Sequence, residues 1–109
     1  MPDEDRIAAF REVADEMPDD PEVRFGLASA YLAAEQVENA ITEYRETIRL
    51  KPDYSAAHRG LGRALERAGQ IAEATAVYRE GLLVATKNGD LQTVKEIEVF
   101  LRRLDKGAG

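Results

Sequence analysis

The chain has 109 residues, of which 44% are hydrophobic and 33% charged, a composition typical of one soluble globular domain rather than of a disordered or membrane-spanning chain. It contains no cysteine, which excludes a disulfide framework, a thiolate metal site and a cysteine nucleophile. Its net charge of −6 disfavours attraction to nucleic acid or to an anionic membrane surface, so we expect neither as a partner.

The N-terminus predicts a cytoplasmic protein that begins with an amphipathic helix. Its first residues, Met-Pro-Asp-Glu-Asp-Arg, are acidic where a secretory signal would be basic, and no apolar run reaches the length of a membrane span. Within residues 3–18, apolar side chains recur at three- and four-residue spacing, which predicts one helix. The members of this face are Ile7, Phe10, Val13, Ala14 and Met17.

Two helical pairs follow, over residues 21–54 and 55–88. In each pair, apolar positions at helical spacing occur twice and are separated by a short polar break, with Gly69 in the second break. Asp20 is expected to cap the first helix, with Pro21 in its first position. A last helix is predicted over residues 89–106, after a terminating Gly89 and a capping Asp90. No strand pattern is present.

The two pairs are related by a repeat of 34 residues. A shift of 34 positions aligns Leu27 with Leu61, Ala40 with Ala74 and Tyr44 with Tyr78, and it also aligns Phe10 with Tyr44. Self-similarity at a fixed period of this length indicates stacked supersecondary units that share one continuous core.

The repeated residues resemble the tetratricopeptide-repeat pattern W-x2-L-G-x2-Y…A-x3-F…P. The matching motifs are Arg24-x2-Leu27-Ala28-x2-Tyr31 with Ala40-x3-Tyr44 and Pro52, then His58-x2-Leu61-Gly62-x2-Leu65 with Ala74-x3-Tyr78. The run Lys95–Leu104 also looks like the closing helix of small bacterial tetratricopeptide proteins. The resemblance implies one all-α domain over residues 1–109: a right-handed superhelix with a half repeat at 3–18, full repeats at 21–54 and 55–88, and a capping helix at 89–106.

The resemblance also implies a function. Proteins of this family bind a peptide segment of a partner along the concave face of the superhelix, without catalysis. Carried over by matching position, the residues expected to bind the partner are Phe25, Ser29, Leu32, Arg59, Arg63 and Arg67. A second function stays open, that of a structural or oligomerisation subunit whose end helices form the interface.

The strip Arg59-x3-Arg63-x3-Arg67 places three cations on consecutive turns of one face, where they repel one another. It either pairs with carboxylates of an acidic peptide, or it is a solvated face relieved by Glu66 or by acids of a neighbouring helix. Residues 1–20 hold eight acids and two arginines, which is the whole net charge, whereas residues 55–88 sum to +2. Because Phe25 and Ser29 replace two members of the family's lysine–asparagine set, we do not expect a terminal chaperone carboxylate as the ligand.

No residue pattern predicts catalysis, a metal or a cofactor. His58 is the only histidine, so a histidine-based metal site lacks partners, and it stands where the family packs an aromatic side chain. We expect it to pack against its neighbours. No nucleophile, base and orienting group occur at a recognisable spacing, so the chain is predicted not to be an enzyme.

The predicted closing helix has a wide apolar arc, for which two interpretations remain. It either packs on the helix before it, or it also supports a weak homodimer through the C-terminal helix, because Val99 points away from the arc and Phe100 lies at its rim.

Overall fold

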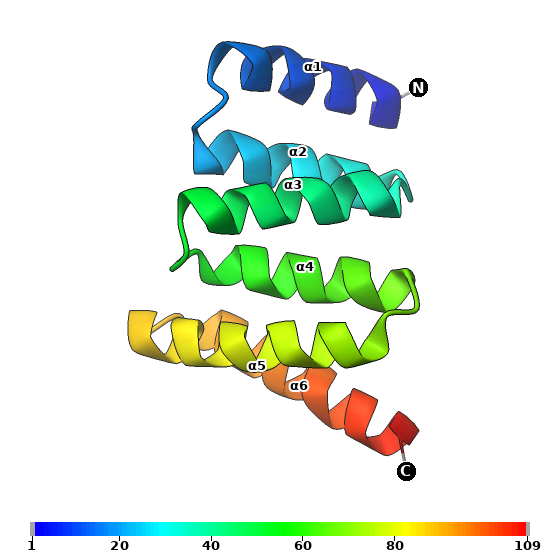
Figure 1. Cartoon of the computed structure of the whole chain (residues 1–109), viewed down its shortest axis with the longest axis vertical. Coiled ribbons are helices and arrows are strands. Elements are labelled where there is room, and N and C mark those ends of the chain that lie inside the picture. Colours follow the sequence, from blue (N-terminus) through cyan, green and yellow to red (C-terminus); the bar gives the residue numbers. More distant parts are fainter. Residues whose placement is uncertain (1, 109) are drawn as a thin grey trace.

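The computed structural model describes residues 2–108 and is all-α, with no strand in that range. Its six helices stack in chain order along the long dimension, each antiparallel to the one before it (Figure 1). The molecule measures 43 × 28 × 19 Å. The helices are α1 (Pro2–Glu16), α2 (Pro21–Ala33), α3 (Val37–Leu50), α4 (Ser55–Arg67), α5 (Ile71–Asn88) and α6 (Leu91–Ala108).

Two capping residues start helices where the sequence predicts. The side chain of Asp20 accepts hydrogen bonds from the backbone amides of the first turn of α2, at 2.9 and 3.3 Å, and Pro21 opens the helix. Asp90 accepts the amide of Thr93 at 3.2 Å and the hydroxyl of Ser55 at 2.6 Å. The second cap therefore also joins α4 to α6, and both predicted caps are confirmed.

The turns within the two helix pairs differ in one residue. Gly69 ends α4 with φ of +79°, a conformation that glycine adopts without steric cost. The matching position after α2 holds Glu35, whose φ is +61°. The same left-handed turn is thus formed once by glycine and once by glutamate, whose Cβ makes this conformation sterically unfavourable.

The aromatic rings of Phe10 on α1 and Tyr44 on α3 each pack against a glycine of the helix that follows. A Cβ added at Gly60 would come within 3.0 Å of the ring of Tyr44, and one added at Gly26 would meet Phe10 in the same way. These two contacts are 34 residues apart in both partners. The close contact between an aromatic ring and the backbone of the next helix therefore recurs after 34 residues. As a result, α1 packs on α2 in the same way as α3 packs on α4.

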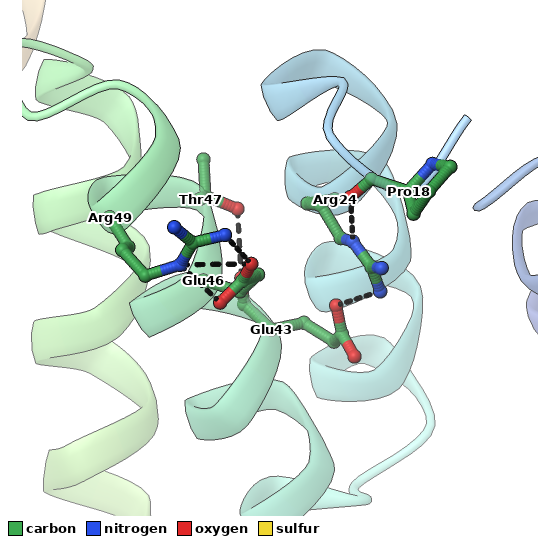
Figure 2. Close-up of polar contacts among 6 residues, drawn as sticks. All are labelled: Pro18, Arg24, Glu43, Glu46, Thr47 and Arg49. Atoms are coloured by element: carbon green, nitrogen blue, oxygen red, sulfur yellow. Dashed lines mark hydrogen bonds and ion pairs between the residues drawn. The ribbon is translucent and has the colours of Figure 1, made fainter. Parts of the chain in front are cut away.

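Arg24 occupies the position at which the repeat pattern has an aromatic residue. Its guanidinium donates to the carbonyl of Pro18 and to the carboxylate of Glu43, each at 3.0 Å (Figure 2). On the same helix as Glu43, the buried hydroxyl of Thr47 donates to the Glu43 carbonyl at 2.8 Å. Polar contacts thus hold the α1–α2 turn against α3 where a ring would otherwise pack.

The C-terminal end departs from the regular stack. Helix α5 has 18 residues where α3 has 14, and α6 crosses obliquely beneath it (Figure 1). Phe100 of α6 is only 9% exposed, and its ring lies 5.4 Å from that of Tyr78. The prediction that Phe100 lies at an exposed rim is wrong, because this ring contact turns it into the core. Val99 is 49% exposed, as expected.

Candidate functional site

A hollow of about 550 Å³ lies between α2, α4 and α6. All six residues that the sequence nominates for partner binding line it: Phe25, Ser29, Leu32, Arg59, Arg63 and Arg67. Helix α2 supplies the first three and α4 supplies the arginines, because residues four apart on a helix share a face. We call this hollow the groove.

The floor of the groove is formed by Tyr44, which reaches between α2 and α4 from the helix behind them. It fits there because Gly60 of α4 has no side chain. The hydroxyls of Tyr44 and Ser29 share a hydrogen bond of 3.1 Å. Phe25 contacts Tyr44 edge to face at 5.9 Å and stacks on Tyr54 at 4.9 Å, so it is fixed in place as an apolar wall.

The three arginines of α4 have different surroundings. Arg59 donates to Glu96 of α6 at 2.8 Å, and Arg67 donates to the carbonyl of Leu32 at 3.1 Å and to Glu35 at 3.2 Å. The guanidinium of Arg63 lies over the ring of Phe100 at 5.1 Å. Within residues 2–108, no carboxylate pairs with Arg63.

Of the two sources of relief that the sequence left open for this strip, Glu66 pairs instead with Arg103 of α6. Its carboxylate accepts the hydroxyl of Tyr78 and, at 2.7 Å, the guanidinium of Arg103. The ring contact between Tyr78 and α6 turns Glu66 toward that helix and away from the groove. Relief by acids of neighbouring segments does occur, at Arg59 and Arg67.

The charge of the strip reaches the groove floor. Burial raises the pKa of the Tyr44 hydroxyl, while the hydrogen bond with Ser29 and then the charges of Arg59, Arg63 and Arg67 act to lower that pKa. The positive charges of all three arginines therefore act on the Tyr44 hydroxyl at the floor of the groove, where they favour its anionic form. The same positive potential favours an anionic ligand there.

Sequence reasoning missed four groove residues. Tyr44 was assigned to the repeat motif and Gly60 to no role, and Gln92 and Glu96 belong to a helix that was expected to cap the stack or to support a homodimer. The oblique course of α6 brings its first turns to the side of α4, which forms the third wall. The sequence did offer one signal for this third wall, since the negative charge of Glu96 is complementary to the arginine strip.

His58 packs in the core, as predicted. It is 2% exposed, and its Nδ1 lies 3.1 Å from the carbonyl oxygen of Tyr54, which can only accept, so Nδ1 carries a proton. Its Cβ lies where a side chain at Gly81 would be. In the described part of the chain, no three metal-ligating side chains cluster. No helix of that part combines the length and the apolar character that crossing a bilayer requires.

Comparisons with known proteins identify relatives of this architecture. A family model described as tetratricopeptide repeat matches residues 5–54 and again residues 25–90. A protein of Bordetella parapertussis, solved in solution, is 34% identical, with 93% of this chain and 88% of that one covered and a TM-score of 0.82. A tetratricopeptide repeat domain protein of Salinibacter ruber is 26% identical, covers 82% of this chain and 90% of its own, and has a TM-score of 0.75.

One similar structure contains a bound peptide. It is the first tetratricopeptide region of the protein Spaghetti, bound to the HSP90 peptide SRMEEVD. It is 22% identical, covers 94% of this chain and 76% of its own, and has a TM-score of 0.82, a likeness of fold. None of the curated proteins matches the chain.

Proposed function

We propose that this chain, which belongs to the tetratricopeptide-repeat family, binds an acidic peptide segment of a partner protein in its groove. Proteins with this fold mediate protein–protein interaction and are generally non-catalytic. The observation that carries the finer proposal is the combination, in one hollow, of a fixed aromatic wall, Phe25, and a cation, Arg63, that pairs with no carboxylate of residues 2–108.

The charges around the groove leave room for ligand carboxylates. Arg63 can donate directly to a ligand carboxylate, and a charge-assisted hydrogen bond of this kind is stronger than a neutral one. The ion pair between Arg67 and Glu35 is exposed, with 71% of the Glu35 side chain accessible, so a ligand carboxylate displaces it at little cost. Arg59 is tied to Glu96 and is expected to change partners least.

The apolar side of the groove predicts a mixed ligand. Phe25 and Leu32 lie on α2 across from the arginines of α4, so a bound segment presents apolar side chains to one wall and acids to the other. The peptide SRMEEVD in the Spaghetti complex has this mixed character, with three acids beside a methionine and a valine. In this chain, Phe25 and Ser29 alter the wall, so we expect acids within a segment to be bound rather than a terminal carboxylate.

The proposal is tested by fluorescence anisotropy with labelled peptides that carry two or three acids around a leucine or phenylalanine. Each peptide has a matched version in which Glu and Asp are replaced by Gln and Asn. We expect Arg63→Ala to weaken binding of the acidic peptides about tenfold or more, because a hydrogen bond to a charged group contributes about 1.5–3 kcal/mol. The matched control is Arg79→Ala, which removes the same charge from an exposed position of α5 outside the groove.

Binding of the amide peptides should be weak to both variants and to the unmodified protein. If Arg63→Ala and Arg79→Ala bind the acidic peptides equally well, the groove is not the site. If the amide versions bind as tightly as the acidic peptides, the arginine strip does not recognise the negative charge of the ligand.

A further inference from the structure

Helix α6 holds the first two arginines of the groove in different ways. The guanidinium of Arg59 donates to the carboxylate of Glu96 at 2.8 Å, whereas that of Arg63 lies over the ring of Phe100 at 5.1 Å. A carboxylate neutralises the cation and accepts from its N–H groups. A ring face attracts the cation without a carboxylate's acceptor oxygens, so the N–H groups of Arg63 remain available to a ligand.

The Arg59 end of the groove contains a second carboxylate, that of Asp90. The hydrogen bonds from Ser55 and Thr93 hold the pKa of Asp90 below its ordinary value, and the charge of Arg59 acts in the same direction. Arg59 therefore lies between two carboxylates, those of Glu96 and Asp90. One cation and two anions sum to −1, so a ligand carboxylate gains little from approaching this end.

The ion pair at the other end of the strip is longer and more exposed. The side chains of Arg67 and Glu35 are 38% and 71% exposed and lie 3.2 Å apart, whereas those of Arg59 and Glu96 are 26% and 38% exposed. Solvent screens the more exposed pair more strongly. Arg67 therefore exchanges its carboxylate for that of a ligand more readily than Arg59 does.

The backbone of α6 fixes the position of Glu96. Thr93 and Ile97, which lie on either side of it in the helix, are 3% and 0% exposed, and Phe100 is also buried. Glu96 therefore cannot move away from α4 unless these side chains leave the core. Glu35, by contrast, lies in the turn after α2, outside any helix.

We propose that Glu96 determines the specificity of the groove by keeping Arg59 paired, so that Arg59 does not bind the ligand. The groove then recognises two acids of a bound segment, opposite Arg63 and Arg67, and a third acid in line with them adds no affinity. This inference rests on the proposed function, because it concerns which acids of a bound peptide the groove recognises.

The spacing of the arginines sets the spacing of the ligand acids. Positions four residues apart on α4 are separated by about 6 Å along the helix axis, at about 1.5 Å per residue. An extended peptide covers this distance in about two residues, at about 3.3 Å per residue, and a helical peptide covers it in about four. The test peptides therefore carry acids at every second or at every fourth position.

The test is fluorescence anisotropy at fixed ionic strength. At each spacing, a peptide with three acids is compared with the two peptides in which the first or the last acid is replaced by Gln. The measured quantity is the ratio of the affinities for three acids and for two acids within one protein. This ratio largely removes the effect that a variant's net charge has on every acidic peptide.

Two matched variants remove one negative charge each from α6. Glu96→Gln takes away the carboxylate partner of Arg59, and Glu98→Gln changes an exposed position of the same helix outside the groove. The double variant Arg59→Gln/Glu96→Gln additionally removes the cation. Far-UV circular dichroism checks that all three remain helical.

In the unmodified chain and in Glu98→Gln, the third acid should leave the affinity unchanged within about twofold. In Glu96→Gln it should strengthen binding about fivefold, which corresponds to about 1 kcal/mol, the upper end of the range for exposed ion pairs. The double variant should lose this gain, because no cation remains opposite the third acid.

The outcomes separate this inference from the proposed function. If acidic peptides bind no better than their amide versions, the proposed function fails and this inference fails with it. If acidic peptides do bind better, three results overturn the role of Glu96 alone. They are a third acid that strengthens binding to the unmodified chain as much as to Glu96→Gln, a third acid without effect in Glu96→Gln, and an equal gain in Glu98→Gln.

Discussion

Glu35 gives the sharpest test of how the turn after α2 is built. As a non-glycine residue with φ of +61°, it bears a backbone cost of about 1–2 kcal/mol that glycine avoids. The substitution Glu35→Gly removes this cost but adds about 0.4–1 kcal/mol of unfolded-state freedom, and it also removes the exposed ion pair with Arg67. The variant Glu35→Gln isolates the last effect, because it loses the ion pair and keeps the Cβ.

We therefore expect Glu35→Gly to be more stable than Glu35→Gln by about 0.5–1 kcal/mol, or about 2–6 °C in Tm. Urea denaturation followed by circular dichroism measures the difference. The reverse change, Gly69→Gln at the matching position after α4, should destabilise the chain. If Glu35→Gly is less stable than Glu35→Gln, the left-handed turn does not cost what its geometry implies.

The same variant has a consequence for binding. Removing the Glu35 carboxylate takes away the ion pair of Arg67 and leaves its hydrogen bond to the Leu32 carbonyl, so acidic peptides should bind Glu35→Gly more tightly than the unmodified chain. Anisotropy titrations at fixed salt measure this. Equal affinity would mean that Arg67 takes no part in the interaction.

Two further predictions concern packing and pH. Gly62→Ala should destabilise the chain by about 1–3 kcal/mol in urea denaturation, because the added methyl group meets the buried ring of Tyr78; an unchanged midpoint would show that the ring can move aside. The hydrogen bond from Ser55, and then that of Thr93, holds the pKa of Asp90 below its ordinary value of 3.8. The Asp90 carboxylate therefore stabilises the fold above that pH. This stabilisation is lost as the pH falls through the lowered pKa. Asp90→Asn should therefore be less stable than the unmodified chain at neutral pH by about 1 kcal/mol, with a difference that shrinks in denaturation curves below about pH 4; a constant difference would contradict this origin.

The repeat made most of the fold predictable. A 34-residue period fixes which face of each helix is buried, so the core follows from two well-matched units, whereas the six nominated groove residues follow from the family resemblance. Asp20 and Gly89 added the helix ends, because their capping chemistry is local. These features depend on spacing and on short-range hydrogen bonds, which a sequence displays directly.

The parts that were missed depend on contacts across the stack. No local signal shows that Glu35 takes a left-handed turn, since the position is set by the pairing of α2 with α3. The side of α6 that faces inward is set by Phe100 against Tyr78, and α6 does not follow the repeat pattern that oriented the other helices. Glu96 enters the groove for the same reason.

The groove takes its positive charge from guanidinium groups, and the chain's only imidazole, that of His58, is buried in the core. Guanidinium groups stay protonated throughout the physiological range, and histidine is the side chain that ordinarily changes charge there. The groove therefore keeps the same charge in acidified and neutral surroundings. Under the proposed function, protonation of the arginine strip therefore does not change over this pH range, and release of an acidic peptide depends on competition, on salt or on a change in the peptide itself.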